Sequence, residues 1–501
     1  MKIRATAVFG NPSVNTIVVD DGVITGLISE DPLPGEPVWE GVAIGGFRDA
    51  HIHPSGYAAA VTGLSVGDAV SFDDLRQRLI DHALASRPGV PVVASRLDEH
   101  RIEEGRIPTR QDLDQVLRAR PIVIHRYCGH VATVNTSALT RAGIRETTPD
   151  PPGGQIDRDE LGRPTGVLRE TAVGLVTSAL ASDIPRADPD RLERALAGLA
   201  GLGITRIDAM VSTGNAMWCG PGNELDDLIA VSDRLPFDVD VFTICSTPAE
   251  LEAAANRIRV AGGRMRWAGW KTFADGSLGG HTAAMNAPFA DSGVSGVLRL
   301  SPTADGAMAD ATLDMGGAIA IHAIGDRANG VVLDFLGELR GGWVDRSKLR
   351  IEHASVLSPE LVRRFADLGV TASVQPAFLA SEADWLADRV GADRARWTYP
   401  FRSLVDAGVP VIAGSDSPVE NPNPWPAVAA ALDHPFNPAE SLDVDQALGL
   451  YGVQPLKVGD PADVMVIDRH PSRTGEIAET AVLGTFIAGA PIDALPLPWP
   501  D

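Results

Sequence analysis

Two histidines one residue apart, His51 and His53, are the first side chains whose type and spacing suggest chemistry. The apolar residues 42–47 before them predict a buried β-strand that runs into a loop at Pro54. Because side chains alternate along a strand, both imidazoles project from one face and can bind one divalent cation. An isolated His-x-His pair is more often an ordinary surface or core pair, so a metal site requires further ligands from elsewhere in the chain.

Four later side chains supply such ligands, each near the end of a predicted strand: Lys271, His322, His353 and Asp416. The C-terminal ends of the strands in a parallel barrel converge on one face, so residues far apart in sequence can surround one cavity. The alternative is that each of these residues stands at a strand end by chance. It requires several independent coincidences and is much the weaker explanation. The six residues therefore predict a metal centre.

The elements that must position these residues alternate between strand and helix, which is typical of βα units around a parallel sheet. After the strand that holds His51 and His53, we predict seven more, at residues 204–210, 238–245, 267–273, 318–322, 349–353, 370–375 and 409–415. Capped helices lie between them, for example at residues 190–201 and 360–368. Eight such units predict an α/β fold, a distorted (β/α)8 TIM barrel, over residues 47–454.

Residues 56–185 interrupt this alternation because they are far too long for one helix. They contain predicted helices at 71–87 and 110–120 and predicted strands at 91–95 and 122–126. We interpret them as an insertion beside the mouth of the barrel, where active sites of this architecture form.

Short β segments occupy both ends of the chain. Residues 16–20 and 23–28 flank Asp21-Gly22, a dipeptide typical of tight hairpins. Residues 458–468 and 481–489 form a similar set near the C-terminus. We predict that residues 1–46 and 455–501 together form one small composite β-sandwich domain.

Composition excludes several classes of function. A net charge of −23 argues against binding to the phosphate backbone of nucleic acids. No apolar stretch reaches the roughly 18 residues of a membrane helix, and the start lacks the features of a signal peptide. The cysteines Cys128, Cys219 and Cys245 are too few and too scattered for a disulfide framework or a cysteine-based zinc site. We therefore expect a cytoplasmic protein.

Several strings resemble those of a known family. The order His-x-His, Lys, His, His, Asp on successive barrel strands looks like the amidohydrolase superfamily with a two-metal site. FADGSLGGHTAA (273–284), IHAIGDRAN (321–329) and GSDSPV (414–419) are similar to its amidohydrolase-3 (YtcJ-like) branch, which includes N-substituted formamide deformylases. Residues 126–135, 153–159 and 462–468 resemble that branch too, so the resemblance covers nearly the whole chain.

The resemblance implies two divalent metal ions, with zinc as the expected metal. One would be bound by His51, His53 and Asp416 and the other by His322 and His353, with Lys271 bridging them as a carbamate derived from CO₂. Only four of the 43 basic residues are lysine, and arginine cannot form this carbamate. Burial beside cations would also lower the lysine pKa from about 10.4, which favours the carbamate.

The implied reaction is hydrolysis of an amide or formamide C–N bond, other than a peptide bond, by a metal-bridging hydroxide. Two cations lower the pKa of bound water from about 15.7 toward about 7, and Asp416 would be the catalytic acid and base. Six residues are candidates for contact with a small-molecule substrate: Arg126, His130, Asp275, His281, Asp326 and Arg327. Four aromatic residues are candidates for an apolar lining, although ordinary packing explains them equally well: Trp218, Trp385, Trp397 and Phe378.

Strand alternation makes one further prediction. Glu352 and Ser415 directly precede ligands, so alternation points them away from the barrel lumen and favours a structural role.

Other functions stay open at this stage. A one-metal deaminase or lactone hydrolase on the same barrel would not need Lys271. A non-catalytic scaffold relative would be expected to have lost ligands, and all six are present. A homodimer is the family-typical expectation, and the substrate itself cannot be inferred because fold alone does not determine it.

Overall fold

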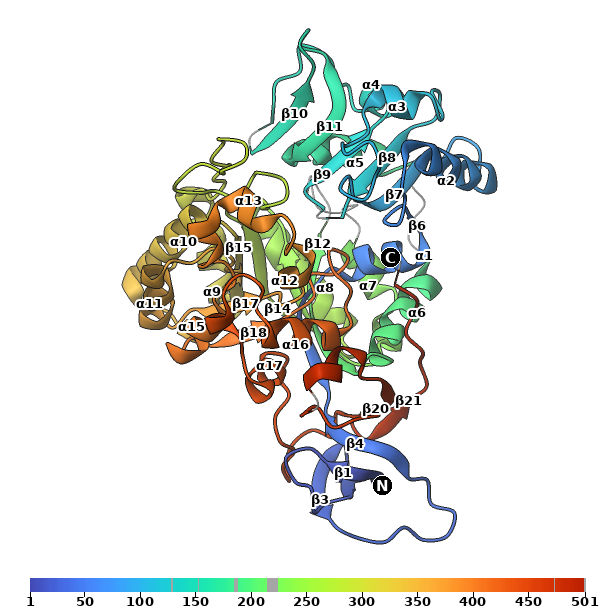
Figure 1. The fold of residues 1–501 in the computed structure, drawn as a ribbon, viewed down its shortest axis with the longest axis vertical. Coiled ribbons are helices and arrows are strands. Elements are labelled where there is room, and N and C mark those ends of the chain that lie inside the picture. The colour runs from blue at the N-terminus through green and yellow to red at the C-terminus, as the bar shows by residue number, and fades with distance from the viewer. Residues whose placement is uncertain (128, 152, 184–187, 214–223, 473, 500–501) are drawn as a thin grey trace.

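A computed structural model describes residues 1–127, 129–151, 153–183, 188–213, 224–472 and 474–499 (Figure 1). Its centre is an eight-stranded sheet in which every pair of neighbours is parallel. The strands, in their order around the sheet, are β5 (Phe47–Ile52), β12 (Ile204–Ser212), β13 (Asp238–Ile244), β14 (Met265–Phe273), β15 (Ala318–Ala323), β16 (Leu349–His353), β17 (Thr371–Val374) and β18 (Val411–Ala413). The (β/α)8 barrel is therefore confirmed.

The barrel closes where its first and last strands end. The N–H of Asp416 donates to the carbonyl of His51 (2.6 Å), and the N–H of His53 donates to the carbonyl of Ser417 (2.9 Å). Closure thus brings the His51–His53 segment directly against Asp416.

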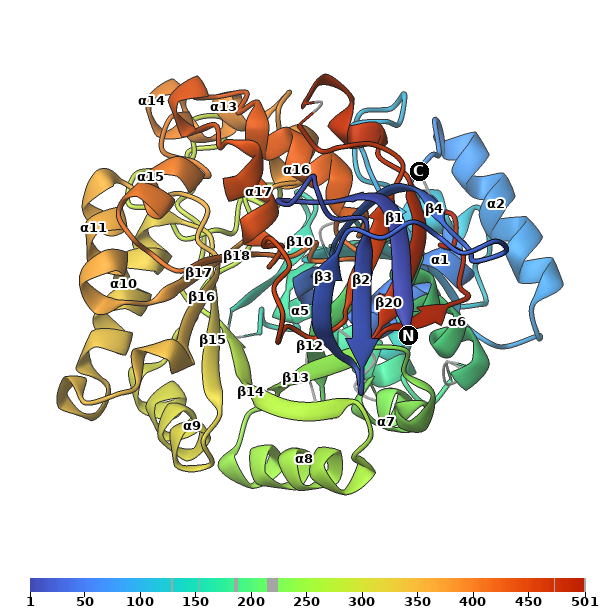
Figure 2. The same ribbon diagram turned by 90° about the horizontal axis from the view of Figure 1, so that it is seen from below.

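Helices surround the barrel, and Figure 2 shows α8 to α11 along its outer side. The helices around the barrel are α1 (Pro54–Thr62), α6 (Pro189–Ala200), α7 (Glu224–Ile229), α8 (Pro248–Ala261), α9 (Pro302–Asp314), α10 (Asp326–Glu338), α11 (Pro359–Leu368), α12 (Phe378–Ser381), α13 (Leu386–Val390), α14 (Ala392–Ala395), α15 (Phe401–Asp406), α16 (Pro424–Leu432) and α17 (Val444–Leu450). Their ends follow local chemistry. Ser358 caps α11 by accepting from the N–H of Leu361, and Gly369 ends it in the left-handed conformation.

The first barrel strand is shorter than its apolar lead-in predicts. Residues 42–45 belong to a separate strand, β4 (Trp39–Gly45), and β5 begins only at Phe47. Gly46 separates the two, and a Cβ at this position would lie 2.3 Å from the side chain of Thr205. Hydrophobic continuity hid this change of sheet because both strands are buried.

The two ends of the chain pair into one seven-stranded sheet below the barrel, as predicted (Figure 1). Its order is β21 (Ala490–Ile492), β20 (Val482–Ile487), β19 (Val464–Ile467), β4, β1 (Lys2–Val8), β2 (Thr16–Asp20) and β3 (Val23–Ile28). The pairing of β1 with β4 shifts register between Ala5 and Ala7. Strands from both ends of the chain contribute to one apolar cluster, which includes Ile17 and Val464.

The predicted insertion forms its own sheet above the barrel (Figure 1). The strands are β10 (Gly154–Arg158), β11 (Pro164–Glu170), β9 (Val131–Val134), β8 (Ile122–Arg126), β7 (Val92–Leu97) and β6 (Leu64–Ser65). The helices of this region are α2 (Phe72–Ala85), α3 (Arg110–Asp114), α4 (Thr136–Arg141) and α5 (Thr171–Leu180).

The helix predicted at residues 110–120 was wrong in length, since α3 ends at Asp114. The amide of Asn135 donates to the carbonyls of Leu117 and Arg120, both at 2.7 Å. This long-range contact holds the following segment in a non-helical path that a local pattern cannot reveal.

No helix in the described part of the chain is long and apolar enough to cross a membrane.

Candidate active site

The six predicted ligands meet at the C-terminal end of the barrel. Ring centroids lie 5.6 Å apart for His51 and His53, 5.0 Å for His51 and His353, and 4.4 Å for His322 and His353. Oδ1 of Asp416 lies 3.3 Å from Nε2 of both His51 and His53. Among the described residues, ligand atoms of His51, His353 and Asp416 lie within 4.8 Å of one another, close enough to hold one ion.

Lys271 lies in the same cluster and is fully buried. Its Nζ lies 3.6 Å from the centroid of the Phe273 ring and 3.4 Å from the carbonyl oxygen of Thr272. Burial is the largest cause that lowers the pKa of His322, and the charge on Lys271 lowers it further. An ammonium group among histidines would repel bound cations, whereas a carbamate at this position would attract them.

Glu352 orients His51, contrary to the prediction that it points away from the lumen. Nδ1 of His51 donates to Oε2 of Glu352 at 2.5 Å, which directs Nε2 toward Asp416. Arg350 and Glu352 share the lumen face of β16, while Ile351 packs in the core outside. The alternation fails at His353 because its backbone is left-handed (φ +73°), which turns this side chain to the lumen as well.

Two more of the four histidines, His353 and His322, bond to neutral acceptors, and Nε2 of His322 also lies 3.4 Å from Oδ1 of Asp275. Nδ1 of His353 donates to Oε1 of Gln375 (2.7 Å), and Nε2 of His322 donates to the carbonyl of Gly276 (3.0 Å). Each ring therefore has one nitrogen fixed by the protein and one available for a ligand, an arrangement usual for metal-binding histidines.

The protonation states also suit a cation. Burial lowers the pKa of His353 to about 3, which keeps its ring neutral. Burial alone would raise the pKa of Asp416, but His51, His53 and His353 together hold it well below its ordinary value. Neutral imidazoles around an ionised carboxylate form a donor set that fits divalent metal ions.

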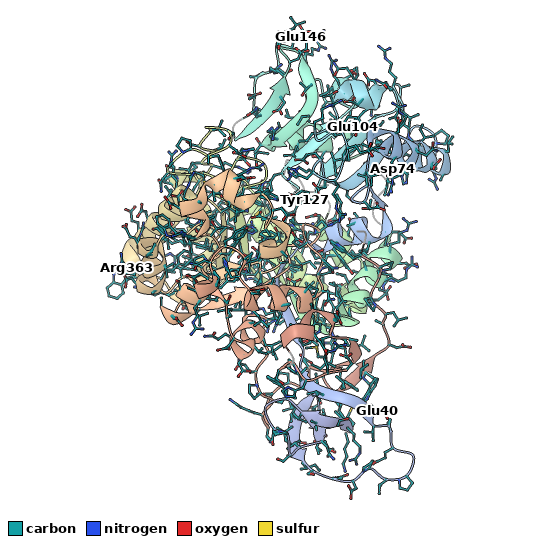
Figure 3. All side chains as sticks on the ribbon, in the orientation of Figure 1. Glu40, Asp74, Glu104, Tyr127, Glu146 and Arg363 are labelled. Atoms are coloured by element: carbon teal, nitrogen blue, oxygen red, sulfur yellow. The ribbon has the colours of Figure 1, made fainter. Side chains whose placement is uncertain are left out.

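A pocket opens onto this cluster. It is lined by Tyr127, His130, Ser277, Leu278, Gly279, His322, Ile324, His353, Phe378, Ser381, Glu382, Tyr399, Asp416, Val419 and Glu420. Figure 3 places Tyr127 where the insertion meets the barrel. The insertion therefore contributes one wall of the pocket, through Tyr127 and His130.

Two predicted substrate contacts lie at this wall. His130 lines the pocket, and its Nδ1 lies 3.0 Å from Glu170, which in turn accepts from Arg299 at 3.0 Å. Arg126 is buried, pairs with Glu99 at 2.8 Å, and stacks on the Tyr127 ring. Of the two, His130 presents its ring to the pocket, and Arg126 supports the wall.

The structure does not bring the other four predicted contacts to the pocket lining. Asp275 is fully buried and accepts from the N–H groups of Ala284, Ile324 and Gly325 at 2.8–3.0 Å. His281 lies 3.0 Å from Asp291. Asp326 and Arg327 lie at the start of α10, where Asp326 accepts from the N–H of Asn286.

Sequence reasoning missed several acidic residues near the site. Glu382 and Glu420 line the pocket, and the hydroxyl of Tyr399 donates to Glu382 at 2.6 Å. Glu224 is buried, and burial raises its pKa to about 7 despite the opposing effect of His53. All three lie outside the ligand strands, so strand-end reasoning had no means to select them.

The aromatic candidates divide similarly. Phe378 lines the pocket, whereas Trp385 and Trp397 do not, and Trp218 lies outside the described residues. Cys245 is a buried free cysteine, while Cys128 and Cys219 also lie outside the described residues.

Comparison with known proteins agrees with this geometry. The model of the amidohydrolase family matches residues 40–493. YtcJ of Bacillus subtilis (strain 168) is 28% identical over 458 residues, which cover 87% of this chain and 85% of that protein. The N-substituted formamide deformylase of Arthrobacter pascens is 28% identical over 488 residues, which cover 89% and 87% of the two chains.

A solved structure shares the fold. An uncharacterized metal-dependent hydrolase from Pyrococcus horikoshii OT3 superposes with a TM-score of 0.71 at 24% identity, over 95% of this chain and 99% of that one.

Proposed function

Because the chain belongs to the amidohydrolase family and is thus a metal-dependent hydrolase of carbon–nitrogen bonds, we propose that it cleaves the C–N bond of a small N-acyl compound. One observation carries the proposal: six ligand-type side chains from five strand ends, five of them buried, meet in one cluster beside a pocket. The name of the Arthrobacter pascens relative makes N-substituted formamides the first compounds to test.

We further propose the ligand assignment. His51, His53 and Asp416 would hold one divalent ion, and His322 and His353 the other. Lys271 would bridge the two as a carbamate, since its Nζ lies within the cluster and affects the pKa of three of the histidines. Zinc is the proposed metal because imidazole and carboxylate donors at such a site suit it.

When bound, such ions activate water at neutral pH and polarise the carbonyl of the substrate. The remaining steps belong to the chain. Asp416 is ionised and lines the pocket, so its carboxylate can take a proton from the attacking water and transfer it to the leaving nitrogen. His130, held by Glu170, offers a ring nitrogen to the substrate, and the insertion wall limits access of bulk water.

The test is an assay of N-formyl and N-acyl amines with metal-reconstituted protein, accompanied by measurement of metal content. Lys271→Ala should lower kcat/KM by roughly 1000-fold, which corresponds to the several kcal/mol that a metal centre contributes to the transition state. Lys457→Ala is the matched control because Lys457 is exposed and lies in the C-terminal region that contributes strands to the terminal sheet.

Equal activity of Lys271→Ala and the wild type would contradict the mechanism. A content of one metal per chain would favour a mononuclear deaminase or lactone hydrolase. Absence of bound metal, together with no loss of stability in chelator, would favour a non-catalytic scaffold.

We also predict a cytoplasmic location and a homodimer. We further predict that the chain divides into a composite terminal domain, a barrel and an insertion. Gel filtration with light scattering tests the homodimer.

A further inference from the structure

The pocket has a second acidic wall that the hydrolytic mechanism does not use. Glu382 follows α12, and Glu420 lies in the loop after β18, four residues beyond Asp416. Both line the same pocket as His322, His353 and Asp416. A substrate that fills this pocket while its acyl group reaches the metal cluster would therefore lie against these two side chains.

Among the described residues, the pocket lining holds acidic side chains without basic ones, and a cation bound in the pocket would favour their ionised forms. Of the described residues in its lining, three are carboxylates and none is lysine or arginine. Bound metal ions would compensate Asp416, which lies within their ligand cluster. Glu382 and Glu420 line the same pocket but are not among the proposed metal ligands.

Three arginines attract the negative charge of Glu382 or Glu420, but each of them also contacts other groups. Arg389 pairs with Asp291 (2.9 Å) and donates to the carbonyls of Leu278 and Gly279. Arg126 pairs with Glu99, and Arg96 donates to the carbonyl of Pro418 (2.9 Å). Their attraction lowers the pKa of the two carboxyl groups only in part. Burial, together with repulsion from Glu420, raises the pKa of Glu382 to about 8. Burial, together with repulsion from Asp416, raises the pKa of Glu420 to about 7.

The rest of the wall suits a short hydrocarbon chain that ends in a cation. The Tyr399 hydroxyl fixes Glu382 in place through its 2.6 Å hydrogen bond. Ile324, Phe378 and Val419 add apolar surface to the lining of the same pocket. An ammonium group has three donors and can bond to two carboxylates at once.

We propose, on the basis of the function proposed above, that the substrate is an N-acyl amine with a second, positively charged nitrogen that Glu382 and Glu420 bind. The substrate class is thus N-acylated diamines rather than neutral or acidic N-acyl compounds. Glu382 and Glu420 determine this specificity, and Tyr399 positions Glu382.

The experiment compares two series of formamides of matched length. One series consists of N-formyl diamines with two, three or four methylenes, and the other replaces the ammonium group by methyl. Calorimetry measures their binding to metal-free protein, which does not hydrolyse them under the proposed mechanism, and steady-state assays use metal-loaded protein. The variants are Glu382→Gln, Glu420→Gln and the double variant, with Glu360→Gln, an exposed site on α11, as control.

In the wild type and the control, the best N-formyl diamine should bind about 10- to 100-fold more tightly than its neutral partner, because hydrogen bonds to charged groups are of this strength. The ratio of the two kcat/KM values should show the same preference. Each single variant should lower the preference, and the double variant should abolish it. Thermal melting verifies that the variants fold.

Equal binding of both series by the wild type, or a preference that persists in the double variant, would overturn the inference. Turnover of neutral formamides without a charge preference would leave the proposed function intact and remove only this inference. A charge preference in binding without any turnover would have the opposite meaning, since the carboxylates would bind a cation in a protein that does not cleave formamides.

Discussion

Glu352 illustrates how single residues prepare the site. It accepts from Nδ1 of His51 and is held in turn by Arg350, which also pairs with Asp208. Burial raises the pKa of Glu352, but Arg350 and His51 more than reverse this and hold it well below its ordinary value. The ring of His51 is thereby locked with Nε2 toward the cluster.

Replacing Glu352 by Gln should therefore weaken metal binding about 10- to 100-fold, as is typical for the partners of ligand histidines. It should also lower the free energy of unfolding by about 3 kcal/mol, because Arg350 is buried and would lose part of its compensation. Competition with a chelator measures the first effect and thermal melting the second. Glu360→Gln is the exposed control, and metal affinity equal to that of the control would contradict the role assigned to Glu352.

Glu382 and Glu420 give rise to a prediction about pH. Both pKa values are raised by burial, to about 8 and about 7, from an ordinary value of 4.5. The folded protein thus binds these protons more tightly than the unfolded chain, so the two groups reduce stability as pH rises from about 5 to about 8. The double Gln variant has no titrating group at these two positions. The difference between its Tm and that of the wild type should therefore rise by about 2 °C between pH 5 and pH 8. A difference in Tm that is constant between pH 5 and pH 8 would contradict this prediction.

At this scale the sequence predicted residues that stand at strand ends and missed those that do not. His51, His322 and Asp416 could be predicted from the sequence because barrel strands converge at their C-terminal ends. Glu382 and Glu420 lie in irregular segments whose positions depend on long-range contacts. Glu352 was assigned the wrong direction because the left-handed backbone at His353 breaks the alternation on which the prediction relied.

Elements show the same limit. The seven later barrel strands were predicted to within two residues at each end, because each is a buried apolar run between turn residues. The division between β4 and β5 was missed since no change in hydropathy marks it. The truncation of α3 depends on hydrogen bonds from Asn135, a residue of another element.

The C-terminal segment after β21 connects the terminal sheet with α1 and with β7 of the insertion. Residues 494–497 run along α6, where added Cβ atoms at Gly198 and Gly201 would meet them. Trp499 then stacks on Tyr57 (centroids 6.3 Å apart) and lies 4.5 Å from the guanidinium of Arg96. Arg96 donates to the carbonyl of Pro418, so this segment supports the loop between Asp416 and Glu420.

Trp499→Ala should consequently lower the Tm by about 2 °C, since it removes a half-buried ring and a cation–π contact. It should also raise KM, because Arg96 would lose the surface that holds it against the loop. Trp343→Ala is a suitable control because 90% of that side chain is exposed. Identical melting curves and KM values for the two variants would exclude a supporting role of the segment.

At the scale of the whole molecule, the terminal sheet is joined to the barrel through its apolar faces. Ile44 and Met465 belong to the core cluster that includes the barrel strands and helices. Ile17 and Val464 belong to the smaller cluster within the sheet itself. Strand β4 and its neighbour β19 therefore contribute side chains to both cores, so the loss of either core should destabilise the other.

This arrangement predicts that sheet and barrel unfold together despite their separate appearance in Figure 1. Ile44→Ala and Ile17→Ala form a matched pair, because both side chains are completely buried and each substitution should cost about 2–5 kcal/mol. Calorimetry of the metal-loaded protein should show that both variants lower the temperature of one common transition. If Ile17→Ala instead shifts a separate early transition and leaves the main one unchanged, the terminal sheet is an independent unit. In that case the contacts of Ile44 and Met465 with the barrel would be too weak to couple the two parts.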